Sequence, residues 1–414
     1  MTQKTSHYKK TLFQAVKIPE SKTPRLFYAA GPGDIVTTFS CWQKGIDDPH
    51  QIAVTYSSQF FDLCKHLGVH GTAISSCQRQ DHIETAQFIV ENLSKGPSRS
   101  GIAYHLQQIN YVRTIVKKAK ATKTDILIIA DSTGHFFPLP WFAPHTMHIV
   151  LSLHCTLWPK SKQNSFNRKI ISKLNRTIFS NKAAGILCLS DDIRRQLTEV
   201  TGGNNAPIQP FIPYYRRELF SSIPPPPKKN PFNLLFAGRM ETSKGIYDLL
   251  EVALMLKRRK NNHIVLHLCG NGPEEENLKN AVHKNGVESI MQLHGYCNQP
   301  DMLKYIGMSH AFIVPTRSSF EEGFNKVVAE AILAGRPVIA TSVCPALNYV
   351  RNAVLEIPPD DALACLNAAI DLSSLPELYR TKQQGCLALQ EQFYDASNSW
   401  KAALERIIRD LQYG

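Results

Sequence analysis

The sequence predicts an α/β protein built from two Rossmann-like domains that face each other across a cleft. Short apolar runs that indicate buried strands alternate with apolar-periodic stretches that indicate helices, on both sides of a proline run at residues 223–230. With 414 residues the chain is longer than one ordinary domain and can bury two cores. This alternation is typical of open parallel sheets, which bind ligands at the carboxyl ends of their strands.

The proline run marks the boundary between the two domains. It contains four consecutive prolines, which cannot join a helix interior or an inner strand, so we expect a stiff, exposed linker. Residues 1–222 then form the first domain and residues 231–394 the second. The strands expected in the first domain are residues 25–29, 52–55, 126–130, 148–152 and 185–189.

Two carboxylates, Glu322 and Glu330, carry the strongest functional signal in the sequence. The apolar run at residues 311–315 indicates a buried strand, and residues 325–334 indicate a short helix that Gly335 closes. Glu322 therefore lies in the loop at the carboxyl end of a strand, and Glu330 lies two turns into the following helix.

Backbone donors lie between these two carboxylates. The N–H groups of Phe324, Asn325 and Lys326 open the helix and have no partner within it, so they favour an anion or the hydroxyl oxygens of a sugar. The two carboxylates can accept hydrogen bonds from vicinal hydroxyls of a sugar and of a ribose. The spacing alone is weak evidence, but together with the fragments below it predicts a sugar-nucleotide site.

A second fragment predicts a cradle for a diphosphate. A strand at residues 234–237 ends in Gly238 and Arg239, and Lys244 with Gly245 precedes a long apolar-periodic helix. A glycine and an arginine at a strand end and a lysine at a helix entrance together suit a diphosphate. The alternative is that both cations are solvated loop charges. A third fragment, with Gly270, Gly272 and Pro273, is by itself compatible with an ordinary turn.

Together these fragments resemble the retaining glycosyltransferases of family four, which have the two-domain GT-B architecture. The resemblance covers residues 231–372 and is carried, in order, by Gly238-Arg239, Lys244-Gly245, Gly270-Asn-Gly272-Pro273, Glu322-Gly-Phe324 and Glu330. In that family the carboxyl-terminal domain binds the nucleotide sugar. The resemblance therefore implies a hexosyltransferase that moves a sugar from a nucleotide-diphosphate sugar to a glycan, a glycolipid or another acceptor.

The resemblance also implies roles for single residues. Arg239 and Lys244 would hold the donor diphosphate and stabilise the departing nucleotide. Glu330 would bind the ribose hydroxyls, and Glu322 with the backbone after it would hold the donor sugar. The donor-binding candidates besides Glu330 are Gly31, Gly33, Gly238, Gly270, Gly272, Pro273, Phe324, Asn325 and Lys326.

The implied mechanism is front-face transfer with retention, in which the donor phosphate helps to remove the acceptor's proton. The sequence has no Asp-x-Asp pair and no His/Cys cluster with metal-ligand spacing, so we expect neither a metal nor another cofactor. Arg239, Lys244 and helix amino termini would neutralise the diphosphate instead. Residues 341–347 lack the glycine pair and the glutamate common in the family, so the base and sugar stay open, with a UDP-sugar expected ahead of a GDP-sugar.

The site candidates of the first domain lie at strand ends. Gly31 and Gly33 follow the first strand, where they would let a backbone approach a phosphate or simply form a tight turn. The resemblance, weaker here, places at His154 a histidine that contacts the donor sugar, so His154 joins the catalytic candidates; the alternative is a structural histidine. Ser190 is expected to cap the next helix rather than to line the cleft.

An apolar-periodic helix closes the chain. Its apolar positions are Leu404, Ile407, Ile408 and Leu411. It resembles the family's last helix, which crosses back to the first domain, so residues 395–414 are expected to complete that domain. The alternative is a closing helix on the second domain.

The positive charge of the chain belongs to its first half. Residues 1–222 carry 27 Lys and Arg against 14 Asp and Glu, whereas residues 231–414 carry 18 against 20. A basic half suggests an acidic partner, either an anionic membrane surface or an acidic or phosphate-bearing acceptor.

One segment of the basic half, residues 165–179, has membrane-surface character. Its apolar positions at helical spacing are Phe166, Ile170, Leu174 and Ile178, with four cations on other faces. Such a helix could lie on a membrane. The preferred alternative is that it packs this apolar stripe on the sheet, because the neighbouring strands need a cover.

The composition favours a cytoplasmic protein. Such a protein could also bind peripherally to the inner face of the plasma membrane. No apolar stretch is long enough to cross a membrane, and residues 1–10 lack the core of a signal peptide. The ten cysteines are scattered singly and indicate reduced core residues rather than a disulfide framework.

Two other functions stay open. A different two-domain nucleotide-sugar enzyme, such as an epimerase or a phosphorylase, could share the fold and the cleft. A nucleic-acid-binding protein is suggested only by the basic half, without any recognised motif, so no nucleic acid is expected as a partner. By analogy with the family, polysaccharide or glycolipid biosynthesis in bacteria is the expected context.

Overall fold

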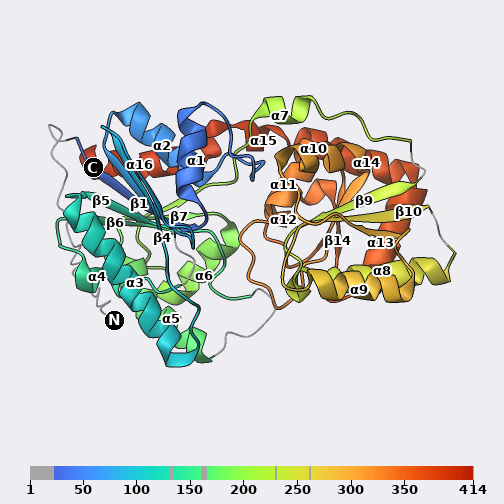
Figure 1. Ribbon diagram of the computed structural model, residues 1–414, viewed down its shortest axis with the longest axis horizontal. Coiled ribbons are helices and arrows are strands. Elements are labelled where there is room, and N and C mark those ends of the chain that lie inside the picture. Colours follow the sequence, from blue (N-terminus) through green and yellow to red (C-terminus); the bar gives the residue numbers. More distant parts are fainter. Residues whose placement is uncertain (1–22, 131–133, 160–165, 229–230, 261–262, 414) are drawn as a thin grey trace, which may run out of the picture.

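The computed structural model describes residues 23–130, 134–159, 166–228, 231–260 and 263–413. Two mainly parallel β-sheets with helices around them lie side by side along the long axis of the molecule (Figure 1). The α/β fold with two Rossmann-like domains is therefore confirmed.

The first sheet has the strand order β3-β4-β2-β1-β5-β6-β7-β8, in which β3 pairs with β4 in the antiparallel sense. Its strands are β1 (Leu26–Pro32), β2 (Gly71–Ser76), β3 (Asp81–Glu84), β4 (Phe88–Leu93), β5 (Ile126–Ile129), β6 (His148–Leu153), β7 (Gly185–Cys188) and β8 (Ile208–Pro210). Its helices are α1 (Ile35–Gln43), α2 (Tyr56–Leu67), α3 (Gly101–Ala121), α4 (Leu139–Phe142), α5 (Phe166–Thr177), α6 (Asp191–Thr201) and the last helix, α16 (Trp400–Tyr413). Because helices cover both faces, the central strands β5 and β6 are buried along their whole length.

The second sheet has the order β11-β10-β9-β12-β13-β14, with parallel pairing throughout the described strands. Its strands are β9 (Phe232–Ala237), β10 (Ile264–Cys269), β11 (Met291–Leu293), β12 (Ala311–Val314), β13 (Val338–Thr341) and β14 (Val354–Ile357). Its helices are α8 (Ile246–Arg258), α9 (Glu275–Asn285), α10 (Gln299–Met308), α11 (Lys326–Leu333), α12 (Leu347–Val350), α13 (Ala362–Ser374) and α14 (Pro376–Ala388). The strand order reverses between β9 and β12, which is where a doubly wound sheet opens a binding crevice.

The proline-rich segment joins α7 (Arg217–Ser221) to β9 along the surface of the second domain. The Pro224 carbonyl accepts a hydrogen bond from Arg336 Nη2 at 2.6 Å, and the Pro227 carbonyl lies 3.2 Å from His310 Nε2. Residues 229–230 lie outside the described residues. Pro224 and Pro227 are therefore tied to the second domain by their carbonyl groups.

The end of the chain returns to the first sheet. After α15 (Glu391–Tyr394), the helix α16 packs against α2, β7 and β8. A Cβ atom on Gly185 would lie only 2.7 Å from Cδ1 of Ile407, so β7 and α16 are in close contact. Trp400 is fully buried and donates from Nε1 to Ser152 Oγ at 2.8 Å.

The strand expected at residues 52–55 is wrong. Ile52 and Val54 are buried, but the Val54 N–H donates to the Tyr214 carbonyl at 2.9 Å, and the segment leads directly into α2. Burial of a short apolar run does not distinguish a strand from a covered loop. The strands β2 and β4 carry mixed polar and apolar residues, which is why sequence periodicity did not single them out.

The prediction that the apolar side chains of residues 165–179 pack on the sheet is also wrong for two of the four residues. Ile170 and Leu174 on α5 are 43% and 45% exposed, whereas Asn175 and Ile178 are buried. Asn175 Oδ1 accepts hydrogen bonds from the backbone N–H groups of Phe136 and Phe137, so this helix turns an amide toward the sheet. The side chain of Phe166 lies outside the described part of the structure.

Candidate active site

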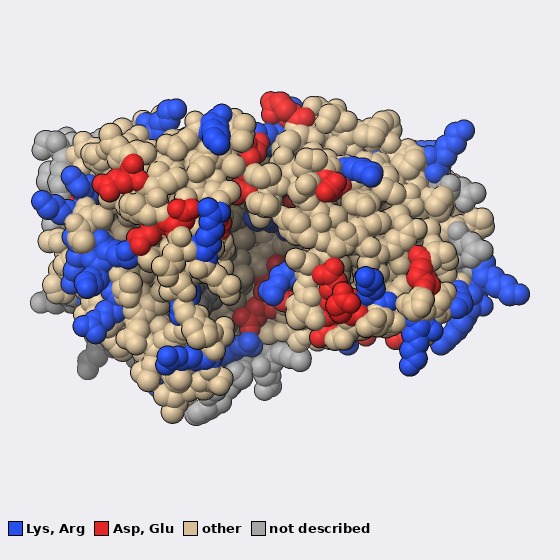
Figure 2. Space-filling model, in the orientation of Figure 1, with Lys and Arg blue, Asp and Glu red and all other residues tan. Residues whose placement is uncertain are grey.

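A cleft of about 900 Å³ separates the two domains, and Figure 2 shows a deep hollow between the two halves of the molecule. It is lined by loops that follow strands β1 and β6, by the start of α2 and by the loop before α11. The predicted residues on its walls are Gly31, Gly33, His154, Glu322, Phe324, Asn325 and Lys326. Residues from both domains, far apart in sequence, thus meet in one cleft.

The loop before α11 has an unusual backbone. Asn325 at the helix cap has φ 58° and ψ 74°, a left-handed conformation that is costly for residues other than glycine. Its side chain supports this turn, because Nδ2 donates to Glu322 Oε2 at 2.9 Å and Oδ1 accepts from Cys344 Sγ at 2.8 Å. The turn therefore fixes the Glu322 carboxylate beside the amino terminus of α11.

Lys244 reaches the same carboxylate from another loop. The short helix η2 (Thr242–Lys244) ends at Gly245, which has φ 78° and where a Cβ atom would lie 2.1 Å from the Pro315 carbonyl oxygen. Lys244 Nζ lies 2.5 Å from Glu322 Oε2, and the two side chains are only 18% and 16% exposed. Together with Lys326 they line a small cavity of about 160 Å³.

The glycines after β9 and β10 bring two loops into backbone contact. A Cβ atom on Gly270 would lie 1.9 Å from the Gly238 carbonyl oxygen, and one on Gly272 would lie 2.6 Å from the Met240 carbonyl oxygen. Pro273 is exposed in the turn before α9. None of these glycines lines the cleft, so their evident task in this structure is to let the loops that carry the site pack closely.

Arg239 and Glu330 lie away from the cleft wall. The Arg239 side chain is 70% exposed and pairs with Glu241 of its own loop at 2.7 Å. Glu330 is buried on α11, and this burial raises the pKa of its carboxyl to about 7, although the nearby Lys326 charge opposes the shift. The two residues expected at the nucleotide are therefore one solvent-exposed cation and one buried carboxyl group.

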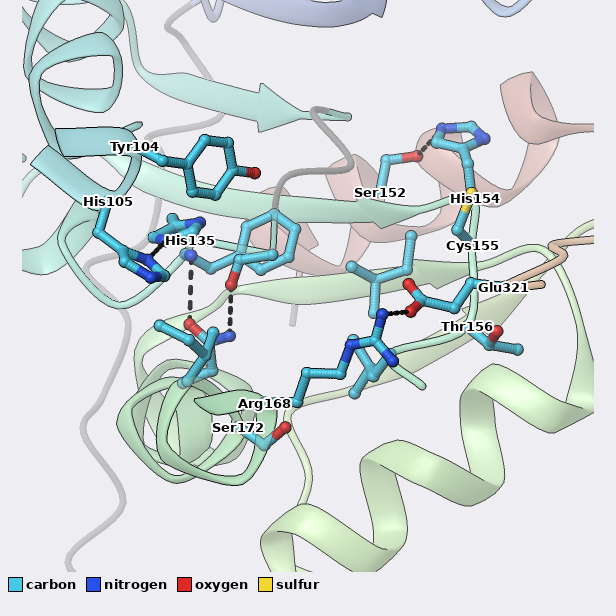
Figure 3. A pocket seen from close by; sticks show the side chains of 16 residues that line it. Tyr104, His105, His135, Ser152, His154, Cys155, Thr156, Arg168, Ser172 and Glu321 are labelled. Carbon is cyan, nitrogen blue, oxygen red and sulfur yellow. Dashed lines mark hydrogen bonds and ion pairs between the residues drawn. The ribbon is translucent and has the colours of Figure 1, made fainter. Parts of the chain in front are cut away.

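His154 faces Glu322 and its neighbours from the first domain. A Cβ atom on Gly323 would lie 1.7 Å from the His154 carbonyl oxygen, so the two domains touch at this point. Its Nε2 lies 2.9 Å from Ser152 Oγ (Figure 3). Burial and the nearby Lys326 charge lower the pKa of His154 to about 3, which keeps the ring neutral at physiological pH.

The other candidates of the first domain are the glycines after the first strand and Ser190. Gly31 belongs to the end of β1, and Gly33 follows it with φ 152°. Ser190 stands at the capping position of α6, but its hydroxyl makes no cap hydrogen bond, so the expected capping role is wrong. That hydroxyl is buried and has no partner among the described residues.

A second cavity of about 350 Å³ adjoins His154 inside the first domain (Figure 3). His105 on α3 and His135 after β5 lie 2.8 Å apart on its wall, between Nδ1 and Nε2. Arg168 on α5 forms an ion pair with Glu321 of the second domain across it, and burial raises the pKa of Glu321. Sequence reasoning missed this cavity because its residues come from separate elements and form no motif.

In the part of the chain that the structure describes, no group of three or more His, Cys, Asp or Glu residues is arranged to hold a metal ion. Lys244 and Lys326 are the cations that line the small cavity.

Residues 220–384 match the family model described as Glycosyl transferases group 1. Among curated proteins, the chain is 29% identical over 136 residues to a D-inositol 3-phosphate glycosyltransferase of Arthrobacter sp. (strain FB24), which covers 32% of this chain and 31% of that protein. It is 30% identical over 128 residues to O-antigen chain mannosyltransferase B of Escherichia coli, covering 31% of this chain and 33% of that protein. The chain thus spans about a third of the length of these relatives.

Solved structures extend the likeness to nearly the whole chain. Sucrose-phosphate synthase from Thermosynechococcus elongatus matches with a TM-score of 0.68 and 19% identity, covering 94% of this chain and 99% of that one. HepE of Anabaena in complex with UDP and glucose matches with a TM-score of 0.65 and 15% identity, again covering 94% and 99%. At this identity the likeness concerns the fold alone, and it confirms the expected GT-B architecture.

Proposed function

We propose that this protein is a glycosyltransferase that moves a sugar from a nucleotide-diphosphate sugar to a glycan, a glycolipid or another acceptor. The observation that carries the proposal is the Lys244–Glu322 pair, held at 2.5 Å beside the amino terminus of α11 and opposite His154. It lies within the segment that matches the Glycosyl transferases group 1 model. A UDP-sugar is favoured over a GDP-sugar, and the fold likeness to a UDP-bound protein supports that choice.

The proposed roles follow the chemistry of each group. Lys244, with Arg239 swinging in from its exposed position, would bind the diphosphate and stabilise the departing nucleotide. Glu322 and the backbone of Phe324 and Asn325 would hold the sugar hydroxyls. Glu330 would accept hydrogen bonds from the ribose.

The proposed mechanism retains the configuration of the transferred sugar. Attack from the face that the nucleotide leaves lets a phosphate oxygen of the donor accept the acceptor's proton, so no enzymic nucleophile is needed. We further propose that no metal takes part, because Lys244 and the free N–H groups of α11 supply positive potential where the leaving charge develops. The cavity beside His154 is the proposed acceptor site, since it adjoins the cleft and mixes aromatic and polar side chains.

The test of this function is nucleotide binding followed by product analysis. With a chelator present, UDP or GDP should raise the melting temperature, because a ligand that binds only the folded state adds about RT ln(1 + [L]/Kd). Incubation with the matching sugar nucleotide and candidate acceptors should then yield a new glycosidic bond with retained anomeric configuration by NMR. Conversion of the sugar without a new bond would instead indicate an epimerase or a phosphorylase.

Peripheral membrane binding through α5 is part of the proposal. No helix within the described ranges is long and apolar enough to cross a membrane. The exposed Ile170 and Leu174 lie among exposed cations, including Lys169 and Lys173, a combination suited to an anionic lipid surface.

Replacing both Ile170 and Leu174 by Asp should abolish co-sedimentation with anionic phospholipid vesicles, because the change removes the apolar contact and adds repulsion. Leu387, 58% exposed on the second domain, offers the matched control, and Leu387→Asp should leave vesicle binding unchanged. Equal binding by all three proteins would refute the role of α5.

A further inference from the structure

Lys326 is an unexpected residue at its position. It is the first residue of α11, where the helix dipole disfavours a cation. It lines both the cleft and the small cavity beside Glu322, and burial lowers the pKa of its ammonium group. Within the described part of the chain this ammonium makes neither an ion pair nor a hydrogen bond. Glu330 influences it only through space.

Two further polar groups beside Lys326 also lack partners. Lys326 Nζ lies 5.1 Å from the centre of the Tyr56 ring, which lies 4.5 Å from the centre of the His154 ring. The Tyr56 hydroxyl and His154 Nδ1 are both buried, and neither has a hydrogen-bond partner among the described residues. Because a buried polar group without a partner is costly, these two atoms, beside an ammonium whose close contact is the face of the Tyr56 ring, indicate a ligand.

The protonation of His154 follows from a chain of hydrogen bonds that begins on the last helix. Trp400 Nε1 can only donate, so Ser152 Oγ accepts at 2.8 Å. Among the described residues, the Ser152 hydroxyl has no other acceptor than His154 Nε2, at 2.9 Å. We therefore assign Nε2 of the neutral ring as the acceptor and place the ring proton on Nδ1, which makes this nitrogen a donor.

We propose that Lys326, His154 Nδ1–H and the Tyr56 hydroxyl bind a carboxylate of the transferred sugar, so that the donor is a nucleotide-diphosphate uronic acid. This inference rests on the proposed function and deepens it. A cation with two neutral donors complements a carboxylate, which accepts several hydrogen bonds. A neutral sugar hydroxyl would leave the ammonium with only the through-space charge of Glu330 as its counter-charge.

The test compares two donors that differ in this one group. Isothermal titration with UDP-glucuronate and UDP-glucose, or with GDP-mannuronate and GDP-mannose if the guanine nucleotide binds, gives the affinity ratio. The wild type should bind the acidic donor at least tenfold more tightly. Lys326→Met keeps the length of the side chain without its charge and should lose this preference.

The control is Lys304→Met on α10, which removes an exposed lysine of the same domain and should leave the ratio unchanged. Thermal unfolding without ligand shows whether the variant is folded, and Lys326→Met should melt at a higher temperature because it removes a buried, unpaired charge.

Two results would overturn the inference while leaving the proposed function intact. One is equal affinity of the wild type for the acidic and the neutral donor. The other is a Lys326→Met variant that loses as much affinity for free UDP or GDP as for the acidic donor, because Lys326 would then bind the diphosphate. If neither nucleotide binds the wild type at all, the proposed function fails as well.

Discussion

Replacing Lys244 by Met is expected to lower kcat by about 10²–10³-fold, the cost of removing one preorganised group that stabilises a developing anion. The ammonium faces the small cavity, and its Nζ is held 2.5 Å from Glu322 Oε2. A diphosphate that enters the cavity would replace Glu322 as its partner. Initial rates at saturating donor and acceptor measure the effect.

The same change leaves Glu322 without its counter-charge, so the fold should lose up to a few kcal/mol of stability. The double variant Lys244→Met/Glu322→Gln separates the two effects, because it should regain stability without regaining activity. Lys279→Met, on the exposed side of α9, controls for the loss of a surface lysine. Near-wild-type turnover of a folded Lys244→Met protein would show that Lys244 does not act in the reaction.

The sequence predicted the strands β9 and β12 and the helix α11 of the second domain well, because the loops beside them have local signals. A buried strand, a glycine and a charged residue occur together after β9 and again after β12. Gly245 and Gly270 are required where a side chain would overlap a carbonyl oxygen of the neighbouring loop. The backbone geometry requires glycine at these positions, so a pattern in the sequence reveals them.

Side-chain direction and contacts between distant segments left no such signal. The Arg239 side chain points outward and pairs with Glu241, two residues later, at 2.7 Å. Asn175 of α5 turns inward because its amide satisfies backbone groups of a loop some forty positions earlier. The chain Trp400–Ser152–His154 depends on α16 returning to the first sheet, and the sequence shows neither partner of that serine.

Glu330→Gln is expected to lower kcat/KM by about 10²-fold, because two hydrogen bonds from a ribose to a carboxylate are each worth about 1.5–3 kcal/mol and become weaker to an amide. It should also change how stability depends on pH. Burial raises the pKa of Glu330 from 4.5 to about 7, so between these values the native state binds a proton that the unfolded state has lost. The free energy of unfolding therefore falls as pH rises through this window, by on the order of 3 kcal/mol in total.

Chemical denaturation at several pH values measures this contribution as the difference between the wild type and Glu330→Gln. The variant should be the more stable protein at pH 8, and the two should converge near pH 4. Glu276→Gln, an exposed position on α9, should follow the wild type at every pH. A constant difference across the window would show that Glu330 is not the titrating group.

Donor binding provides an independent measurement of the same carboxyl group. Ribose hydroxyls favour the ionised carboxylate, so UDP or GDP should release up to one proton from the wild type near pH 7 and none from Glu330→Gln. Isothermal titration in buffers of different ionisation enthalpy counts these protons. Proton uptake, or no proton exchange, by the wild type would show that the nucleotide does not bind the ionised Glu330 carboxylate. The sign of this one measurement therefore decides whether the nucleotide contacts Glu330.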